Sequence, residues 1–182
     1  HVTILPAVIV LKMIINAIKQ INAHKVRVCV HSGHQEQGKD FDESFAHTVL
    51  GRSIKICVAI ACYLVWLSFH FDIHNAFQTT PDKSPEAERT WLWINSTWLD
   101  YFRERHPDKW PLVQKLLDQG YTPEQFAVEM FMFVQGRTDA SRKWGELVEE
   151  FIFSILGLLP NRADPCTDSG IYNGAPVILC RA

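Results

Sequence analysis

Asp72 is the residue of this sequence whose chemistry most needs an explanation, because it directly follows an apolar stretch, residues 67–71. That stretch predicts a short strand over 69–73, and a carboxylate at the end of a buried strand costs free energy unless it is paired or binds a cation. Mg²⁺ takes oxygen ligands from one or two carboxylates together with substrate phosphates. Asp72 is therefore either a Mg²⁺ ligand or a cap of the following turn through Asn75, and its position alone leaves both interpretations open.

The charge and the cysteines of the chain indicate which partners and which redox compartment to expect. The chain has 182 residues, which suits one domain or part of a larger one. Its 18 basic and 20 acidic residues nearly balance, so the overall charge does not indicate nucleic-acid binding. The first 30 residues are the exception, because they contain Lys12, Lys19, Lys25 and Arg27 and no acid. Five widely spaced cysteines without a C-x-x-C pair indicate free thiols in a reducing compartment.

The one long apolar run covers residues 54–71 and is interrupted by Lys55, Ser68 and His70. Its uninterrupted part is about 12 residues, whereas a helix needs ~20 to span a bilayer. The run therefore predicts a buried helix over 53–64 that leads into the strand at 69–73, and no membrane segment.

Hydrophobic periodicity predicts both strands and helices along the chain. Further strands are expected over 8–13, 25–30, 91–94 and 177–180, and further helices over 98–105, 111–119 and 140–156. The last helix has the clearest pattern, since its apolar residues form a single stripe. Asn173 and Gly174 between two apolar runs predict a hairpin with a type I′ turn. Because strands and helices do not alternate strictly, the expected fold class is α+β.

Five blocks of the sequence, in order, resemble the reverse transcriptases of Ty1/copia-type retrotransposons. Residues 72–78 (DIHNAFQ) resemble that family's first catalytic motif, D-x-x-x-A-F. Residues 25–30 (KVRVCV) resemble its K-A-R-L-V-A strand, and residues 40–46 (DFDESFA) its D-Y-x-E-T-F-A-P segment. Residues 134–136 (VQG) resemble the second palm motif, and residues 161–166 (NRADPC) the segment before the active-site hairpin.

The resemblance implies the fingers and palm of a right-hand polymerase, with an antiparallel palm sheet packed on helices. Residues 1–68 would form the fingers and the start of the palm, and residues 69–182 the palm. Residues 81–126 are longer than the family's usual connection and would be an insertion. The sequence stops at Ala182, just before the x-D-D motif is expected, so the resemblance implies that this fragment is inactive alone.

The implied activity is RNA-directed DNA polymerisation, in which a primer 3′-hydroxyl attacks a dNTP at a site with two Mg²⁺ ions. Asp72 would be the catalytic residue that holds both ions, together with the expected aspartate pair. Phe77 would lie under the deoxyribose and exclude a 2′-hydroxyl, and the alternative for Phe77 is ordinary core packing.

The other implied site residues are expected to contact the nucleotide. Lys25 and Arg27, two positions apart on one strand face, would donate charge-assisted hydrogen bonds to the triphosphate. Which of the two contacts phosphate stays open, as does the alternative of a solvated edge strand. Gln135 and Gly136 would place an amide and a closely approaching backbone beside the incoming base.

The implied partners are an RNA template, a DNA primer, dNTPs and the rest of a retrotransposon polyprotein, with its integrase and RNase H. The implied location is intracellular, in a cytoplasmic virus-like particle. A second interpretation is a degenerate or repurposed copy that serves as a non-catalytic nucleic-acid-binding or structural module. A third, a small metal-dependent hydrolase, would need a second carboxylate that converges on Asp72, and no motif supplies one.

Overall fold

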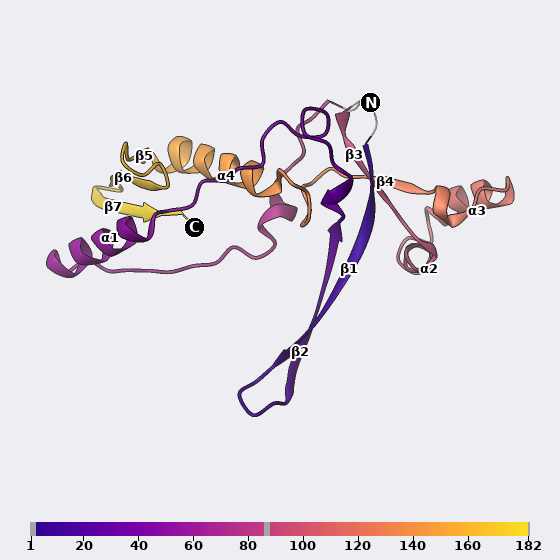
Figure 1. The fold of residues 1–182 in the computed structure, drawn as a ribbon, viewed down its shortest axis with the longest axis horizontal. Coiled ribbons are helices and arrows are strands. Elements are labelled where there is room, and N and C mark those ends of the chain that lie inside the picture. The colour runs from indigo at the N-terminus through magenta and orange to yellow at the C-terminus, as the bar shows by residue number, and fades with distance from the viewer. Residues whose placement is uncertain (1–2, 86–87, 182) are drawn as a thin grey trace. The chain divides into compact units, whose positions relative to one another are not determined.

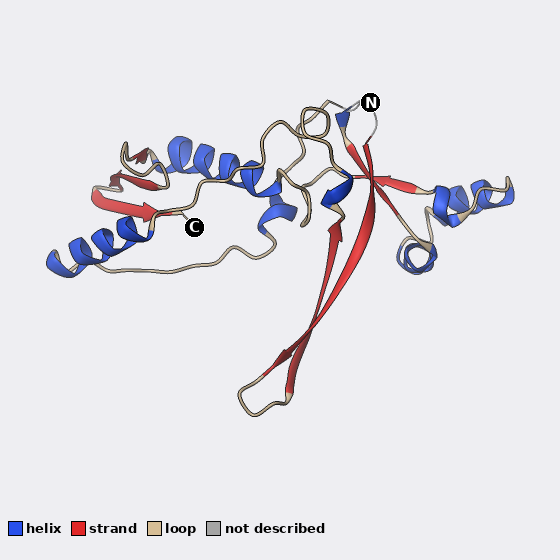
Figure 2. Ribbon diagram, viewed as in Figure 1, coloured by secondary structure: helices blue, strands red, loops and turns tan. Residues whose placement is uncertain are grey.

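The computed structural model describes residues 3–85 and 88–181, and the chain forms two compact units. Unit 1 consists of His1–Asp42 and Phe77–Ala140, and unit 2 of Glu43–Ala76 and Ser141–Ala182. Each unit is therefore built from two separate stretches of the chain. Their helices and strands are labelled in Figure 1 and coloured by type in Figure 2.

Unit 1 is built on a four-stranded sheet with the order β2-β1-β3-β4. Strands β1 (Thr3–Ile15) and β2 (Ile21–Val30) form a long antiparallel hairpin. Strand β3 (Thr90–Trp93) pairs in parallel with the first residues of β1 and antiparallel with β4 (Ala127–Glu129). Because only Thr3–Pro6 of β1 pairs with β3, the rest of the hairpin extends from the sheet as a two-stranded ribbon (Figure 1).

The core of unit 1 lies where the hairpin meets β3 and β4. Its buried members are Leu5, Val30, Leu92 and Met130, and Ala7 and Val134 pack against them. Burial of each such side chain contributes roughly 1.5–3 kcal/mol relative to exposure, so this cluster is the main anchor of the hairpin.

Three short helices of unit 1 lie between β3 and β4 in the sequence. They are α2 (Ser96–Arg105), α3 (Trp110–Asp118) and the 3-10 helix η4 (Pro123–Gln125). Asn95 caps α2, because its side-chain oxygen accepts a hydrogen bond from the Trp98 N–H at 3.2 Å. The connection from β3 to β4 is therefore structured through local caps.

Unit 2 combines two helices with a three-stranded antiparallel sheet of order β5-β6-β7. Helix α1 (Gly51–Tyr63) contacts β7, and all of α4 (Ala140–Phe151) but its first residue belongs to this unit. The strands are β5 (Leu159–Pro160), β6 (Thr167–Tyr172) and β7 (Ala175–Cys180). A π-helical turn, η5 (Ile152–Leu156), continues α4 and ends at Gly157, whose φ is +67°.

The α+β class expected from the sequence is confirmed, because both units combine helices with strands. Helices α2 and α3 lie close to their predicted positions, and α4 with η5 covers the predicted helix at 140–156. Asn173 and Gly174 have φ values of +50° and +79°, as the predicted type I′ turn requires. Patterns that depend on neighbouring residues therefore predicted these elements well.

The strand predicted over 69–73 is wrong. Residues 66–73 have no regular secondary structure, and the Phe69 and Phe71 side chains are 83% and 68% exposed. A strand needs a partner for its N–H and C=O groups, and no described strand pairs with this segment. The preceding helix is also less buried than expected, since α1 has no fully buried residue. No helix within the described residues is long and apolar enough to cross a bilayer.

Candidate functional site

Three cations share one face of the β1–β2 hairpin. The register pairs Lys12 with Lys25 and Val10 with Arg27. Because residues directly opposite each other in an antiparallel pair point to the same side, Lys12, Lys25 and Arg27 lie on one face. All three side chains are exposed. The sequence showed Lys25 and Arg27 on one face, but Lys12 joins them only through the register of the hairpin.

This cationic face has no acidic partner within the part of the chain that the structure describes. Like charges placed directly opposite each other, such as Lys12 and Lys25, destabilise a strand pair. The opposite face of the ribbon carries mainly apolar side chains, with Leu11 opposite Val26, and also His24 opposite Met13. An anion bound across the cationic face would relieve the repulsion, so this face is suited to a phosphate-bearing ligand.

The loop with Gln135 and Gly136 lies against the end of β2. The Val30 N–H donates a hydrogen bond to the Gln135 carbonyl oxygen at 2.9 Å, and the Cys29 thiol lies 3.9 Å from the Gln135 side-chain oxygen. A Cβ atom on Gly136 would lie 2.1 Å from the Val30 carbonyl oxygen, and Gly136 has a φ of +93°. The Gly136 backbone therefore lies close to the Val30 carbonyl group. The approach to an incoming base that the resemblance implies stays a prediction.

Arg137, which follows Gly136, belongs to a buried cluster of charged side chains. The Arg137 guanidinium donates to both carboxylate oxygens of Asp139 at 3.0 Å and to Asp82 at 2.7 Å. All three residues are more than nine-tenths buried, and the guanidinium stacks 4.0 Å from the centre of the Phe133 ring. Burial alone would raise the pKa of Asp82, but hydrogen bonds from Ser84 and Arg137 outweigh it and hold that pKa below its ordinary value.

A second contact joins the same loop to the segment after β2. The Thr138 N–H and hydroxyl both donate to the Gln35 side-chain oxygen, at 2.9 and 3.0 Å. The loop 135–139 is thus connected to β2 by a backbone hydrogen bond, to Asp82 by an ion pair and to the Gln35 side chain by two hydrogen bonds. No local pattern in the sequence indicates the Arg137 cluster, because Asp82 lies 55 positions before Arg137.

We call the cations Lys12, Lys25 and Arg27 together with Gln135 and Gly136 the hairpin site. It contains four of the site residues expected from the sequence, and all five members belong to unit 1. The hairpin site combines exposed cations on one strand face with a hydrogen-bonded loop at the end of that strand.

Asp72 and Phe77, the other two site residues expected from the sequence, are not members of the hairpin site. Asp72 belongs to unit 2 and is exposed within the irregular residues 66–73, whereas Phe77 belongs to unit 1 and is half-buried in the 3-10 helix η2 (Ala76–Thr79). Water solvates an exposed carboxylate, so the burial cost that singled out Asp72 in the sequence does not apply. The described residues contain no group of three or more His, Cys, Asp or Glu side chains that could hold a metal ion.

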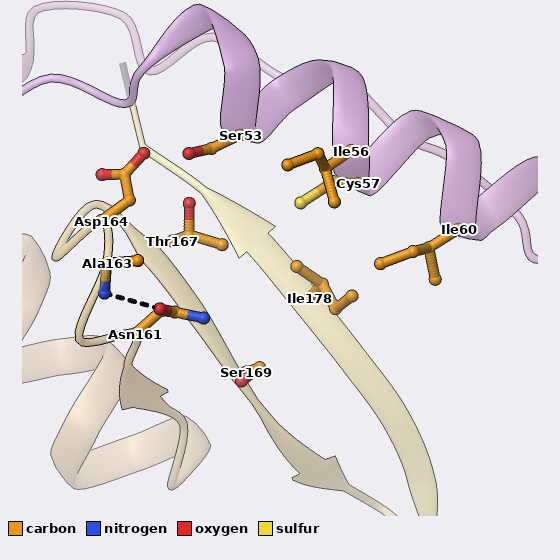
Figure 3. Close-up of a pocket in the computed structure, with 10 residues that line it drawn as sticks. All are labelled: Ser53, Ile56, Cys57, Ile60, Asn161, Ala163, Asp164, Thr167, Ser169 and Ile178. Atoms are coloured by element: carbon orange, nitrogen blue, oxygen red, sulfur yellow. Dashed lines mark hydrogen bonds between the residues drawn. The ribbon is translucent and has the colours of Figure 1, made fainter.

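Unit 2 contains a separate pocket of about 190 Å³ between α1 and the β6–β7 hairpin (Figure 3). Its lining residues are Ser53, Ile56, Cys57, Ile60, Asn161, Ala163, Asp164, Thr167, Ser169 and Ile178. One side is therefore aliphatic, and the other carries hydroxyl, amide and carboxylate groups.

The buried Asp164 connects the wall of this pocket to the start of α1. Its carboxylate accepts hydrogen bonds from the Leu50 N–H at 2.9 Å and from the Cys166 N–H at 3.1 Å. The Ser53 hydroxyl and the Leu50 N–H lower the pKa of Asp164. Leu50 precedes the first residue of α1 and has no side-chain cap of its own, so Asp164 supplies the cap from 114 positions away.

Comparison of the chain with protein-family models, curated proteins and solved structures gives no match.

Proposed function

We propose that this chain is the fingers and palm part of a copia-type RNA-directed DNA polymerase, which adds nucleotides from dNTPs to a primer 3′-hydroxyl. The observation that carries the proposal is the contact in unit 1 between β2 and the Gln135–Gly136 loop. The family resemblance selected these two blocks separately, and Cys29 and Gln135 are 106 positions apart. Their contact supports the proposal because both blocks are expected to serve the same nucleotide.

In this proposal the cationic face of the hairpin binds the triphosphate of the dNTP. Lys25 and Arg27 are the residues expected from the resemblance, and Lys12 adds a third donor from the neighbouring strand. A triphosphate has enough oxygens to accept from all three, and its charge would offset the repulsion between Lys12 and Lys25. Gln135 and Gly136 would then border the incoming base.

The remaining roles follow the resemblance. The β5-β6-β7 sheet of unit 2 would be part of the antiparallel palm sheet. Asp72 would supply one carboxylate ligand to the two Mg²⁺ ions. Phe77 would contact the deoxyribose. The partners would be an RNA template, a DNA primer and the remainder of the polyprotein.

Removing two cations from the hairpin site is expected to weaken dNTP binding. In the double variant Lys25→Ala/Arg27→Ala, loss of charged hydrogen bonds worth ~1.5–3 kcal/mol each should raise the Kd for dATP at least roughly tenfold. Lys12→Ala should weaken binding by a smaller factor. Isothermal titration calorimetry of the 182-residue chain with dATP measures both effects.

The matched control is Lys109→Ala/Lys115→Ala, which removes two exposed lysines of the same unit beside and within α3. This control should leave the Kd for dATP unchanged. Equal affinities in the wild type and in both double variants would contradict a triphosphate site on the hairpin, as would failure of the wild type to bind dATP at low salt.

Phe77→Val in the full-length protein is expected to increase ribonucleotide incorporation relative to deoxynucleotide incorporation by roughly tenfold. The aromatic ring would occupy the volume that a 2′-hydroxyl needs, so its removal helps the rejected substrate alone. Primer extension on an RNA template, with kcat/KM determined for dNTPs and rNTPs, gives the ratio.

Phe126→Val is the control, because Phe126 is also a half-buried phenylalanine of unit 1. It should lower stability without changing the ratio. If Phe77→Val lowers the melting temperature and leaves the ratio unchanged, Phe77 is a core residue and not a gate. Full-length protein that binds dATP and template–primer but does not extend the primer would support the non-catalytic module instead.

A further inference from the structure

Two cysteines of unit 2 lie on two elements that pack against each other, Cys57 on α1 and Cys180 on β7. Cys57 lies on α1 and lines the pocket together with Ile178 of β7 and Thr167 of β6 (Figure 3). Cys180 lies two positions after Ile178 on β7 and is therefore on the same strand face. The register also pairs Cys180 directly with Thr167, which places the two side chains on one side of the hairpin.

Helix α1 packs against β7, and Cys57 is among the groups that raise the pKa of Cys180, so the two thiols are neighbours. Both cysteines are half-buried and free. Cys62, also on α1, is exposed, and Cys166 is buried. Cys57 and Cys180 are thus the pair that the packing of α1 against β7 brings together, although 123 positions of sequence separate them.

Cys57 is among the residues that line the pocket, and Cys180 is not. The pocket volume of about 190 Å³ is ample for a molecule of the size of water or hydrogen peroxide. Burial and the contact with Cys57 raise the pKa of Cys180 to about 11, so Cys180 is a thiol at neutral pH. Oxidation is therefore expected to start at Cys57, with Cys180 as the resolving thiol.

We propose that Cys57 and Cys180 form an intramolecular disulfide when the protein meets a small peroxide. The Cys57 thiolate attacks one peroxide oxygen and breaks the O–O bond, which gives a sulfenic acid and, after protonation, one water. Cys180 then loses its proton and attacks the Cys57 sulfur. The S–S bond forms, and the sulfenic oxygen leaves as a second water. The two thiols lose two electrons in total, and the peroxide gains them.

The disulfide would tie α1 to the last residue of β7 within unit 2. It does not depend on the polymerase proposal, because it requires only the contact between these two elements. The free thiols expected in a reducing compartment are the starting state of this reaction. The cysteine pair would then be a modification site that responds to oxidative conditions.

Treatment of the reduced 182-residue chain with hydrogen peroxide tests this proposal. After alkylation of the remaining thiols, peptide mapping by mass spectrometry without reduction should show a peptide that joins residues 57 and 180. The number of free thiols should drop by two, the melting temperature should rise, and dithiothreitol should reverse both changes.

Cys57→Ser and Cys180→Ser should each abolish the linked peptide, whereas Cys62→Ser, a change on the same helix, should leave it in place. The wild-type peptide map does not depend on how well these variants fold. A link from Cys180 to Cys166, a link that involves Cys62, or oxidation of Cys62 alone with the other thiols still free would overturn the proposal.

Discussion

The Arg137→Met variant is expected to lose about 3–5 kcal/mol of its free energy of unfolding. Methionine fills much of the volume of the arginine but leaves the carboxylates of Asp82 and Asp139 buried without a positive partner. In the wild type the guanidinium donates to both of them, at 2.7 and 3.0 Å. Urea denaturation of the wild type and the variant at neutral pH gives the difference.

The pH dependence of this difference follows from the pKa of Asp82. In the wild type that pKa lies below its ordinary value of 3.8, so the pair contributes stability above this pH and loses it as the pH falls through the native value. Without Arg137 the pKa of Asp82 is higher than in the wild type, although the hydrogen bonds from Ser84 still lower it, and Asp82 takes up a proton more readily. The gap between wild type and variant should therefore be largest at neutral pH and shrink on acidification.

Arg103→Met is the matched control for Arg137→Met. Arg103 pairs with Asp100 at 3.2 Å, and both side chains are more than half exposed, so the loss should stay within ~1 kcal/mol. Adding Asp82→Asn to the Arg137→Met variant should recover part of the stability, because it removes one uncompensated charge. Equal losses in the two single arginine variants would show that the cluster does not stabilise unit 1.

The second large effect is expected from Gly136→Ala. Gly136 and Gly120 both have a φ of +93°, so alanine at either position is strained by roughly 1–2 kcal/mol. At position 136 the new Cβ would also lie 2.1 Å from the Val30 carbonyl oxygen, whereas at position 120 it would meet nothing within 4 Å. The backbone has to shift at position 136, which should cost a further 1–3 kcal/mol, approximately.

Gly120→Ala thus isolates the strain that the two positions share, and the excess loss at position 136 reports the contact with Val30. Urea denaturation measures both variants. The shift should also weaken dATP binding by the hairpin site, since Val30 ends the strand that carries Lys25 and Arg27. Equal losses of stability at the two glycines would contradict the close approach of the loop to β2.

The patterns that predicted structure correctly are those that depend on a few neighbouring residues. The apolar stripe of α4 and the Asn173–Gly174 turn report local backbone geometry, which the chain adopts wherever it lies. The strand predicted at 69–73 shows the opposite case. Its alternating residues suit a strand, but a strand exists only with a neighbour that takes its hydrogen bonds, and that neighbour cannot be read from residues 69–73.

The hairpin site, too, could be predicted from the sequence only in part. The positions of Lys25, Arg27, Gln135 and Gly136 came from the sequence through its family resemblance. Lys12 joined them only with the register of the hairpin, because a shift of one residue would turn its side chain to the opposite face. The gate role of Phe77 and the polymerase activity remain predictions for the primer-extension experiment above, and Mg²⁺ binding by Asp72 also remains a prediction.

By itself the sequence determined the α+β class, most helices, the I′ turn and the cation-rich first strands, because residue type and spacing act over one or two turns of chain. Only the tertiary structure decided which distant groups come together: Asp82 with Arg137, Val30 with Gly136, and the helix of Cys57 with the strand of Cys180. These contacts depend on how whole surfaces pack, and packing energy is shared among many side chains at once. No local pattern therefore identifies the partner of a buried arginine, a positive-φ glycine or a half-buried thiol.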